Sequence, residues 1–269
     1  MVDKINFKSG YSKVNGLKMY YEIYGQGNPL VLIHGGGSTI QTSFGRIIPK
    51  LARHRKIIAL ELQAHGRTND RNTFLTFKQD ADDVATLLKN LEIAKADFLG
   101  FSNGGQTLIE IALRHSELIN KLIICSAFYK KNAVASQFWE EFSHATLSDM
   151  PQAYQDEFLK INNNRDALLN MFHKDVQRMA NFNDWSDKQI ASIKAPVFII
   201  NGNNDVSSIE HAVEMHRLIP NSQLAILPGG HGDYIGELTR QKDDSELPDL
   251  TVSMIEEFLD NKIGSDKKK

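Results

Sequence analysis

Continuous apolar runs alternate with longer amphipathic stretches over most of the chain. Six of these runs have the length and composition of strands, and they lie at residues 30–33, 56–60, 97–101, 122–126, 197–201 and 223–227. Strands of a parallel sheet are buried on both faces, so their sequences are unbroken apolar runs. The pattern therefore predicts a mostly parallel sheet whose strands are connected by helices.

The first part of the chain predicts two antiparallel strands at an edge of that sheet. Residues 17–24 alternate apolar and polar side chains, residues 10–16 form a second extended segment, and Asn15-Gly16 favours a tight hairpin turn between them. Apolar residues repeat with helical periodicity at 77–91, 104–115 and 249–259. We therefore expect an α/β fold with helices flanking the sheet.

The strand pattern is interrupted between residues 127 and 193. Helix-like sequence replaces it and carries many aromatic side chains: Phe128, Tyr129, Phe138, Trp139, Phe142, Phe158, Phe172, Phe182 and Trp185. We predict a core of residues 1–127 and 194–262, a helical cap of residues 128–193 over the strand ends, and a flexible tail of residues 263–269. The alternative is an extra helical layer in which most of the aromatic side chains only pack.

Charge and cysteine content narrow the possible functions. The 31 basic and 33 acidic residues give a formal net charge of -2, without the basic excess that nucleic acid or an anionic membrane surface would require. The single cysteine, Cys125, lies in an apolar run and is expected to be a buried, inert thiol. The sequence shows no secretory signal and no apolar stretch that could cross a bilayer. We expect a cytoplasmic protein with a small-molecule substrate; the sequence does not define an oligomeric state.

The segment Gly100-Phe-Ser-Asn-Gly104 places a serine between a predicted strand and a predicted helix. A serine in such a tight turn adopts a strained backbone conformation, and the flanking glycines allow neighbouring backbone to approach. The Ser102 hydroxyl would then project at a helix N-terminus, where negative charge is stabilised. A simple helix cap is the alternative, but it requires neither the glycines nor the buried strand. We predict that Ser102 is a nucleophile.

Three glycines follow the first central strand in His34-Gly-Gly-Gly37. Their amides can approach a ligand closely, so we expect Gly36 or Gly37 to form an oxyanion hole together with the amide of Asn103. The pattern does not decide between the two glycines. A flexible connection or a phosphate-binding loop are the alternatives, but the spacing of a dinucleotide fingerprint is missing. The His34 ring is expected to brace this loop.

Two turn-rich segments follow the last two predicted strands, and they contain Asp205 and His231. The order Ser, Asp, His along the chain is the order that a serine nucleophile of this strand-turn-helix type uses. The imidazole would accept the serine proton, and the carboxylate would orient the imidazole. Asp233 is the main rival for the acid. The other histidines, including His211, are interpreted as surface residues, and their spacing suggests no metal site; no cofactor is expected.

These motifs resemble the α/β-hydrolase superfamily over nearly the whole chain. The resemblance implies an eight-stranded sheet, a cap inserted after the sixth strand, and esterase, lactonase, carbon-carbon bond hydrolase or related activity. Residues 63–68 are similar to a loop of many members, with Glu61 and Ala64 departing from its pattern, and the loop is expected to border the pocket. Ser102 stands where epoxide and halide hydrolases carry Asp, which argues against both chemistries.

We expect a carboxylesterase-like serine hydrolase that cleaves a small, hydrophobic ester through an acyl-enzyme, with Ser102, Asp205 and His231 as catalytic residues. The first alternative is a lactonase or a carbon-carbon bond hydrolase that uses the same three residues. Polar groups in the cap that could bind a substrate carboxylate would favour carbon-carbon hydrolysis. The second alternative is a non-catalytic protein that binds a small ligand in the same pocket.

Overall fold

The computed structural model describes residues 6–242 and 244–261. Within these residues, eight strands form one sheet in the order β1-β2-β4-β3-β5-β6-β7-β8. The strands are β1 (Phe7–Val14), β2 (Leu17–Tyr24), β3 (Pro29–Ile33), β4 (Lys56–Leu60), β5 (Ala96–Phe101), β6 (Ile119–Cys125), β7 (Val197–Gly202) and β8 (Ser222–Leu227). β1 pairs with β2, and β2 with β4, in antiparallel fashion, whereas the other neighbours are parallel. The predicted α/β fold with a mostly parallel, eight-stranded sheet is confirmed.

The edge hairpin forms where the sequence predicts it. Asn15 and Gly16 have φ angles of 43° and 86°, as a two-residue turn of the hairpin type requires. β1 begins three residues before the predicted segment, and the ring of Phe7, its first residue, packs on Tyr24 with ring centroids 4.9 Å apart. Cross-strand aromatic contacts of this kind stabilise antiparallel pairs.

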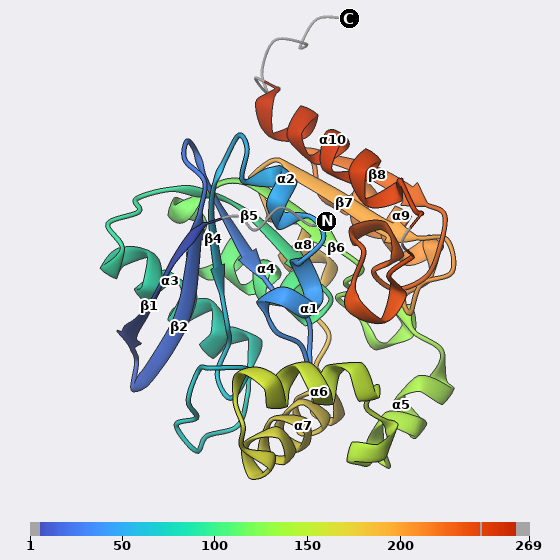
Figure 1. Cartoon of the computed structure of the whole chain (residues 1–269). Helices are drawn as coiled ribbons and strands as arrows, with labels where there is room; N and C mark the ends of the chain where they lie inside the picture. The colour runs from blue at the N-terminus through green and yellow to red at the C-terminus, as the bar shows by residue number, and fades with distance from the viewer. Residues whose placement is uncertain (1–5, 243, 262–269) are drawn as a thin grey trace, which may run out of the picture.

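Helices cover both faces of the sheet (Figure 1). The helices are α1 (Ile40–Phe44), α2 (Ile48–Leu51), α3 (Phe77–Asn90), α4 (Asn103–Arg114), α5 (Ser136–Ser143), α6 (Gln152–Ile161), α7 (Arg165–Ala180), α8 (Asp187–Ala191), α9 (Ile209–Leu218) and α10 (Leu247–Asp260). One apolar cluster joins α3, α4, α8 and α9 to one face of the sheet, and a second joins α1, α2 and α10 to the other face. The three longest predicted helices correspond to α3, α4 and α10.

The segment between β6 and β7 contains α5, α6, α7 and α8. Figure 1 shows α5, α6 and α7 grouped beyond one end of the sheet, and Phe158, Leu168 and Met171 form a small apolar cluster of their own there. In contrast, α8 packs against α9, and Ile190 and Ile193 join the core under the sheet. The boundaries at residues 128 and 193 stay a prediction. The predicted tail, residues 263–269, lies outside the described residues.

Among the described residues, no helix combines the length and the apolar character needed to span a membrane. Cys125 is fully buried in β6, and burial raises the pKa of its thiol to about 12. A thiol with this pKa stays protonated at neutral pH, so it is a poor nucleophile. The expectation of a buried cysteine is confirmed.

Candidate active site

Ser102 lies in the turn between β5 and α4 with a strained backbone. Its φ and ψ angles are 53° and -122°, a combination that side-chain-bearing residues rarely adopt. The Ser102 amide donates to the Cys125 carbonyl at 2.9 Å and fixes the turn to the neighbouring strand. This conformation leaves the serine at the N-terminus of α4, in the place that the sequence predicted.

The glycines on either side of Ser102 make this turn possible. A Cβ atom at Gly104 would lie 2.0 Å from the carbonyl oxygen of Ile33, and one at Gly100 would lie 2.3 Å from the carbonyl oxygen of Gly104. Both contacts are with backbone atoms, which cannot move aside without disturbing the sheet. The two glycines are therefore required for close approach of β3, β5 and α4.

Asp205 and His231 meet at the carboxyl ends of β7 and β8. The Nδ1 atom of His231 lies 2.7 Å from Oδ1 of Asp205, whose side chain is fully buried. Burial alone would raise the pKa of Asp205, but hydrogen bonds from His231, Ser126 and the Gly202 amide lower it below its usual value. Asp205 is thus an ionised acceptor that orients the ring, so that Nε2 is the nitrogen able to take a proton.

Ser126 and Tyr234 support this pair, although neither residue was predicted from the sequence. The Ser126 hydroxyl donates to Oδ2 of Asp205 at 2.5 Å and lies 2.6 Å from the Tyr234 hydroxyl. Ser126 has a φ of 50°, so its backbone is strained in the same sense as that of Ser102. No sequence motif marks Ser126, because only the packing of β6 beside β7 brings it to Asp205.

The predicted oxyanion loop, residues 35–37, is held at both ends. The His34 ring bonds the Gly35 carbonyl through Nδ1 at 2.7 Å and accepts the Leu62 amide at Nε2 at 3.0 Å, so it braces the loop as expected. Burial lowers the pKa of His34 to about 3, which keeps this ring neutral. At the other end, the Gly37 amide donates to Oδ2 of Asp175 at 2.5 Å.

The amides of Gly36 and Asn103 remain available. Within residues 6–242 and 244–261, neither amide donates a hydrogen bond to the protein. A Cβ atom at Gly36 would lie 2.4 Å from Nδ2 of Asn103, so the two residues are in close contact across the turn. The predicted donor set of Gly36, Gly37 and Asn103 is brought together, but Gly37 is already bonded to a carboxylate.

A cavity of about 680 Å³ lies over these groups. Ser102, His231, Gly36, Gly37 and Asn103 form its base. Its remaining walls come mainly from the segment between β6 and β7: Phe128, Phe138, Glu141, Phe142, His144, Ala145, Asp149, Met150, Pro151, Tyr154, Phe172, Asp175, Val176 and Met179, with Val206 from the loop after β7. Four of the nine aromatic residues singled out in the sequence therefore line the cavity.

Three other expectations have clear outcomes. Asp233 accepts the Gly230 amide at 2.5 Å and does not bond the His231 ring, so it is not the acid partner. His211 is buried, not on the surface as expected, because its Nε2 accepts the Tyr129 amide at 3.1 Å. Residues 63–68 were expected to border the pocket but are absent from its walls; His65 reaches it only through Asp175. The described residues contain no His, Cys, Asp or Glu group arranged to hold a metal.

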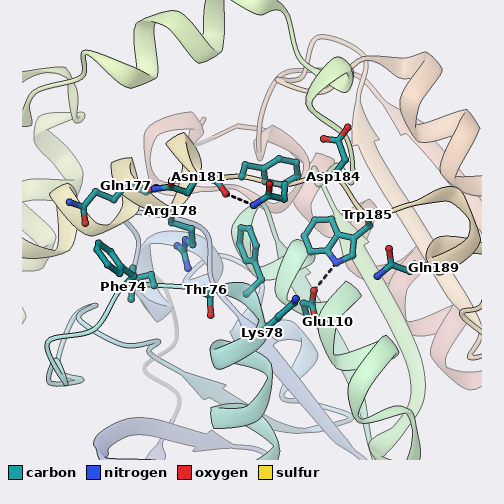
Figure 2. A pocket seen from close by; sticks show the side chains of 14 residues that line it. Phe74, Thr76, Lys78, Glu110, Gln177, Arg178, Asn181, Asp184, Trp185 and Gln189 are labelled. Carbon is teal, nitrogen blue, oxygen red and sulfur yellow. Dashed lines mark hydrogen bonds between the residues drawn. The ribbon is translucent and has the colours of Figure 1, made fainter.

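A second cavity of about 490 Å³ lies on the far side of α7 and contains none of the predicted site residues (Figure 2). Figure 2 shows Trp185 hydrogen-bonded to Glu110, at 2.7 Å, and Arg178 in the wall of this cavity. The rings of Phe77, Phe182 and Trp185 pack on one another here as part of the apolar core. The cavity is thus a gap at the edge of the core, away from Ser102.

The strand order and the strained serine turn are those of the α/β-hydrolase class. A family model described as the alpha/beta hydrolase fold matches residues 28–174, which is more than half of the chain. The chain belongs to this family of hydrolases.

Individual relatives agree with this assignment. The chain is 29% identical to the uncharacterized hydrolase YugF of Bacillus subtilis, over 91% of this chain and 96% of that protein. It is 24% identical to 2-hydroxy-6-oxo-2,4-heptadienoate hydrolase of Pseudomonas putida, over 78% and 84% of the two chains. The solved structure of a serine hydrolase involved in carbazole degradation superposes with a TM-score of 0.77 at 23% identity, covering 94% and 99% of the chains. At this identity the structural likeness shows the fold alone.

Proposed function

We propose that the protein is a serine hydrolase of the carboxylesterase type that acts on small, uncharged, hydrophobic esters through an acyl-enzyme. The observation that carries the proposal is the Asp205–His231 hydrogen bond at the base of the same cavity as Ser102. The proposal assigns Ser102 as nucleophile, His231 as general base and acid, and Asp205 as the group that orients His231. Residues 128–193 are proposed to act as the cap that selects the substrate.

In the first half of the proposed reaction, the Ser102 hydroxyl attacks the ester carbonyl carbon and passes its proton to Nε2 of His231. The carbonyl oxygen gains negative charge and is stabilised by the amides of Gly36 and Asn103. We assign Gly36 and not Gly37, because the Gly37 amide already donates to Asp175. The C–O bond to the leaving alcohol then breaks, and the alcohol takes the proton from His231.

In the second half, His231 removes a proton from water, and the resulting hydroxide attacks the acyl-enzyme carbonyl. The same amides stabilise the second oxyanion. Collapse of this intermediate releases the carboxylic acid and returns the proton to Ser102. No other group is required, since the three side chains and two amides supply each proton transfer and each charge contact.

Carbon-carbon bond hydrolysis is the second candidate, because the Pseudomonas putida relative is named as a hydrolase of a dienoate, a carboxylate-bearing compound. A site for such a substrate needs a cation for the carboxylate. Among the described residues that line the Ser102 cavity none is Lys or Arg, whereas Glu141 and Asp149 are acidic. These walls favour an uncharged substrate, which supports the ester over the dienoate.

The test is hydrolysis of p-nitrophenyl esters of increasing acyl length by the wild type and by Ser102→Ala. We expect turnover of short acyl esters and a loss of about a thousandfold or more in the variant. Labelling of the wild type by a fluorophosphonate, with none in Ser102→Ala, checks the nucleophile without a substrate. Absence of both turnover and labelling would favour the ligand-binding alternative. Labelling without ester turnover would favour lactone or carbon-carbon bond hydrolysis.

A further inference from the structure

Asp175 is a buried carboxylate of α7 that contacts the oxyanion loop. Its Oδ2 atom accepts the Gly37 amide at 2.5 Å and lies 2.8 Å from Nε2 of His65. Its other oxygen pairs with Arg178, one turn later on the same helix. A residue from the segment between β6 and β7 therefore holds a loop that begins at the end of β3, and the reaction proposed above does not use it.

The oxyanion loop needs such a contact because it consists of three glycines. Glycine backbone is more flexible than that of other residues, so the loop has no intrinsic preference for one conformation. Gly35 is fixed by the His34 ring and by a hydrogen bond from its amide to the Ser43 hydroxyl at 3.3 Å. Gly37 is fixed by Asp175 in a left-handed conformation, with φ of 63°. Gly36, whose amide is free, lies between these two fixed points.

A carboxylate at this position requires compensating charge. A Cβ atom at Gly36 would lie 3.4 Å from Oδ2 of Asp175, so an unpaired negative charge there would repel an oxyanion nearby. Burial lowers the pKa of His65 and Asp175 raises it, and the net effect is a pKa above the usual value. The Nδ1 atom of this ring is hydrogen-bonded to the Gln63 carbonyl. Burial opposes ionisation of Asp175 too, but Arg178 and His65 hold its pKa well below the usual value.

Arg178 connects this group to the main core. The Nη1 atom of Arg178 donates to Asp80 of α3 at 2.9 Å. Both side chains are almost completely buried. Figure 2 shows Arg178 at the wall of the second cavity, and its guanidinium lies over the Phe77 ring at 5.1 Å. Asp175 is therefore held by the loop after β3 and the loop after β4, and its partner Arg178 is bonded in turn to α3.

We propose that Asp175 is a positioning residue for catalysis: it fixes the Gly37 peptide and thereby aims the Gly36 amide at the developing oxyanion. His65 and Arg178 neutralise the carboxylate so that it orients the loop without repelling the oxyanion. This inference rests on the proposed serine-hydrolase function. It makes the oxyanion hole depend on the segment between β6 and β7, because that segment carries Asp175.

The test compares Asp175→Ala with Lys174→Ala, its neighbour on α7. Lys174 joins the same helix to the core through Asp70 and the Thr73 carbonyl, at 2.8 and 2.6 Å, but it does not line the Ser102 cavity. Loss of either side chain removes a contact between α7 and the core, whereas only Asp175 contacts the oxyanion loop. Lys174→Ala thus controls for a general loosening of the helix.

We expect Asp175→Ala to lower kcat about tenfold to a hundredfold with KM changed less than about threefold, since misaligned donors weaken transition-state contacts. Its affinity for a trifluoromethyl ketone, which forms an oxyanion on the serine, should fall by a similar factor. Affinity for the corresponding methyl ketone, which binds without forming the adduct, should change little. Asp175→Asn keeps an acceptor oxygen for Gly37 and should retain more activity than Asp175→Ala.

Equal kcat values for Asp175→Ala and Lys174→Ala would overturn the inference, as would a rise in KM at unchanged kcat. If Asp175→Ala does not fold, Asp175→Ser, whose side chain is one bond shorter and so withdraws the acceptor from the Gly37 amide, is compared with Lys174→Ala by the same measurements and the same criteria. Failure of the proposed function itself is distinct, because the wild type would then show neither ester turnover nor fluorophosphonate labelling. An active wild type with fully active Asp175 variants would refute only the role of Asp175.

Discussion

At the residue scale, the backbone of Ser102 stores strain where the proposed chemistry takes place. Its φ of 53° and ψ of -122° are maintained by the hydrogen bond to the Cys125 carbonyl and by the packing of Gly100 and Gly104 against backbone. Strain of this kind costs on the order of 1–3 kcal/mol and persists only where the surroundings enforce it. The strained conformation exposes the Ser102 hydroxyl at the N-terminus of α4, and the energy of the strain lowers the stability of the fold.

The strain predicts an unusual order of stability for two variants. Ser102→Gly should be more stable than Ser102→Ala by about 1 kcal/mol, because glycine tolerates this backbone and alanine does not. Urea unfolding of both variants gives the difference in free energy. Ser253, an exposed residue inside α10, is the matched control, and there glycine should be less stable than alanine by about 1 kcal/mol. The same order at both positions would contradict strain at Ser102.

At the element scale, the link between α7 and the loop after β4 depends on ionisation. The pKa of His65 is raised above its ordinary value of 6.5 by Asp175, against the effect of burial. A raised histidine pKa contributes stability that is complete below pH 6.5 and is lost as the pH rises through the folded-state value. The lowered pKa of Asp175 contributes stability above about pH 4 that is lost as the pH falls. The pair should therefore stabilise the protein most between these limits.

This window predicts a pH-dependent effect of His65→Gln. The variant should be destabilised by about 2 kcal/mol or more at pH 6, since it leaves a buried carboxylate with one cation fewer. The difference from the wild type should shrink as the pH rises above 6.5 and through the raised folded-state pKa of His65, where the ring loses its proton. Thermal or urea unfolding across this range measures it. His173→Gln, at an exposed position of α7, should show no such dependence. A constant difference for His65→Gln would show that the ring is neutral throughout.

At the scale of the whole molecule, five separate regions contribute to the cavity. The segments after β3, β5 and β8 supply its base, the loop after β7 contributes Val206, and the segment between β6 and β7 supplies most of its walls. The cations that α7 carries at Lys174 and Arg178 do not line the cavity, and they are paired with Asp70, Asp80 and Asp175. The cavity is consequently apolar and acidic, although the chain as a whole has a formal net charge of only -2.

This charge distribution predicts discrimination against anionic esters. The p-nitrophenyl ester of butyrate should be hydrolysed with a kcat/KM at least about tenfold above that of the p-nitrophenyl hemiester of succinate, because no Lys or Arg among the described lining residues compensates the added carboxylate. Part of the difference should disappear at high salt, where exposed Glu141 and Asp149 are screened. A preference for the hemiester would point to a cation in the site and would favour the dienoate-type substrate.

The positions of the strands along the chain and of the Ser102 turn were predictable because local patterns encode them. Unbroken apolar runs correspond to β3 through β8, and Gly100-Phe-Ser-Asn-Gly104 corresponds to a turn whose glycines meet backbone at 2.0 and 2.3 Å. The carboxyl ends of parallel strands lie at one edge of the sheet, so the sequence alone could assign Ser102, Asp205 and His231 to one place. Their catalytic roles stay a prediction until the variants are measured.

Residues without a local motif could not be assigned in this way. Ser126 and Asp175 are ordinary polar residues in the sequence, and the prediction of an exposed His211 was wrong because helical periodicity does not show that the loop with Tyr129 covers this ring. By itself, the sequence determined the sheet, the strained serine turn and the candidate Ser, Asp and His, since each depends on neighbours along the chain. Only the tertiary structure decided that Asp175 holds Gly37 and leaves Gly36 free, because that contact joins residues 138 positions apart.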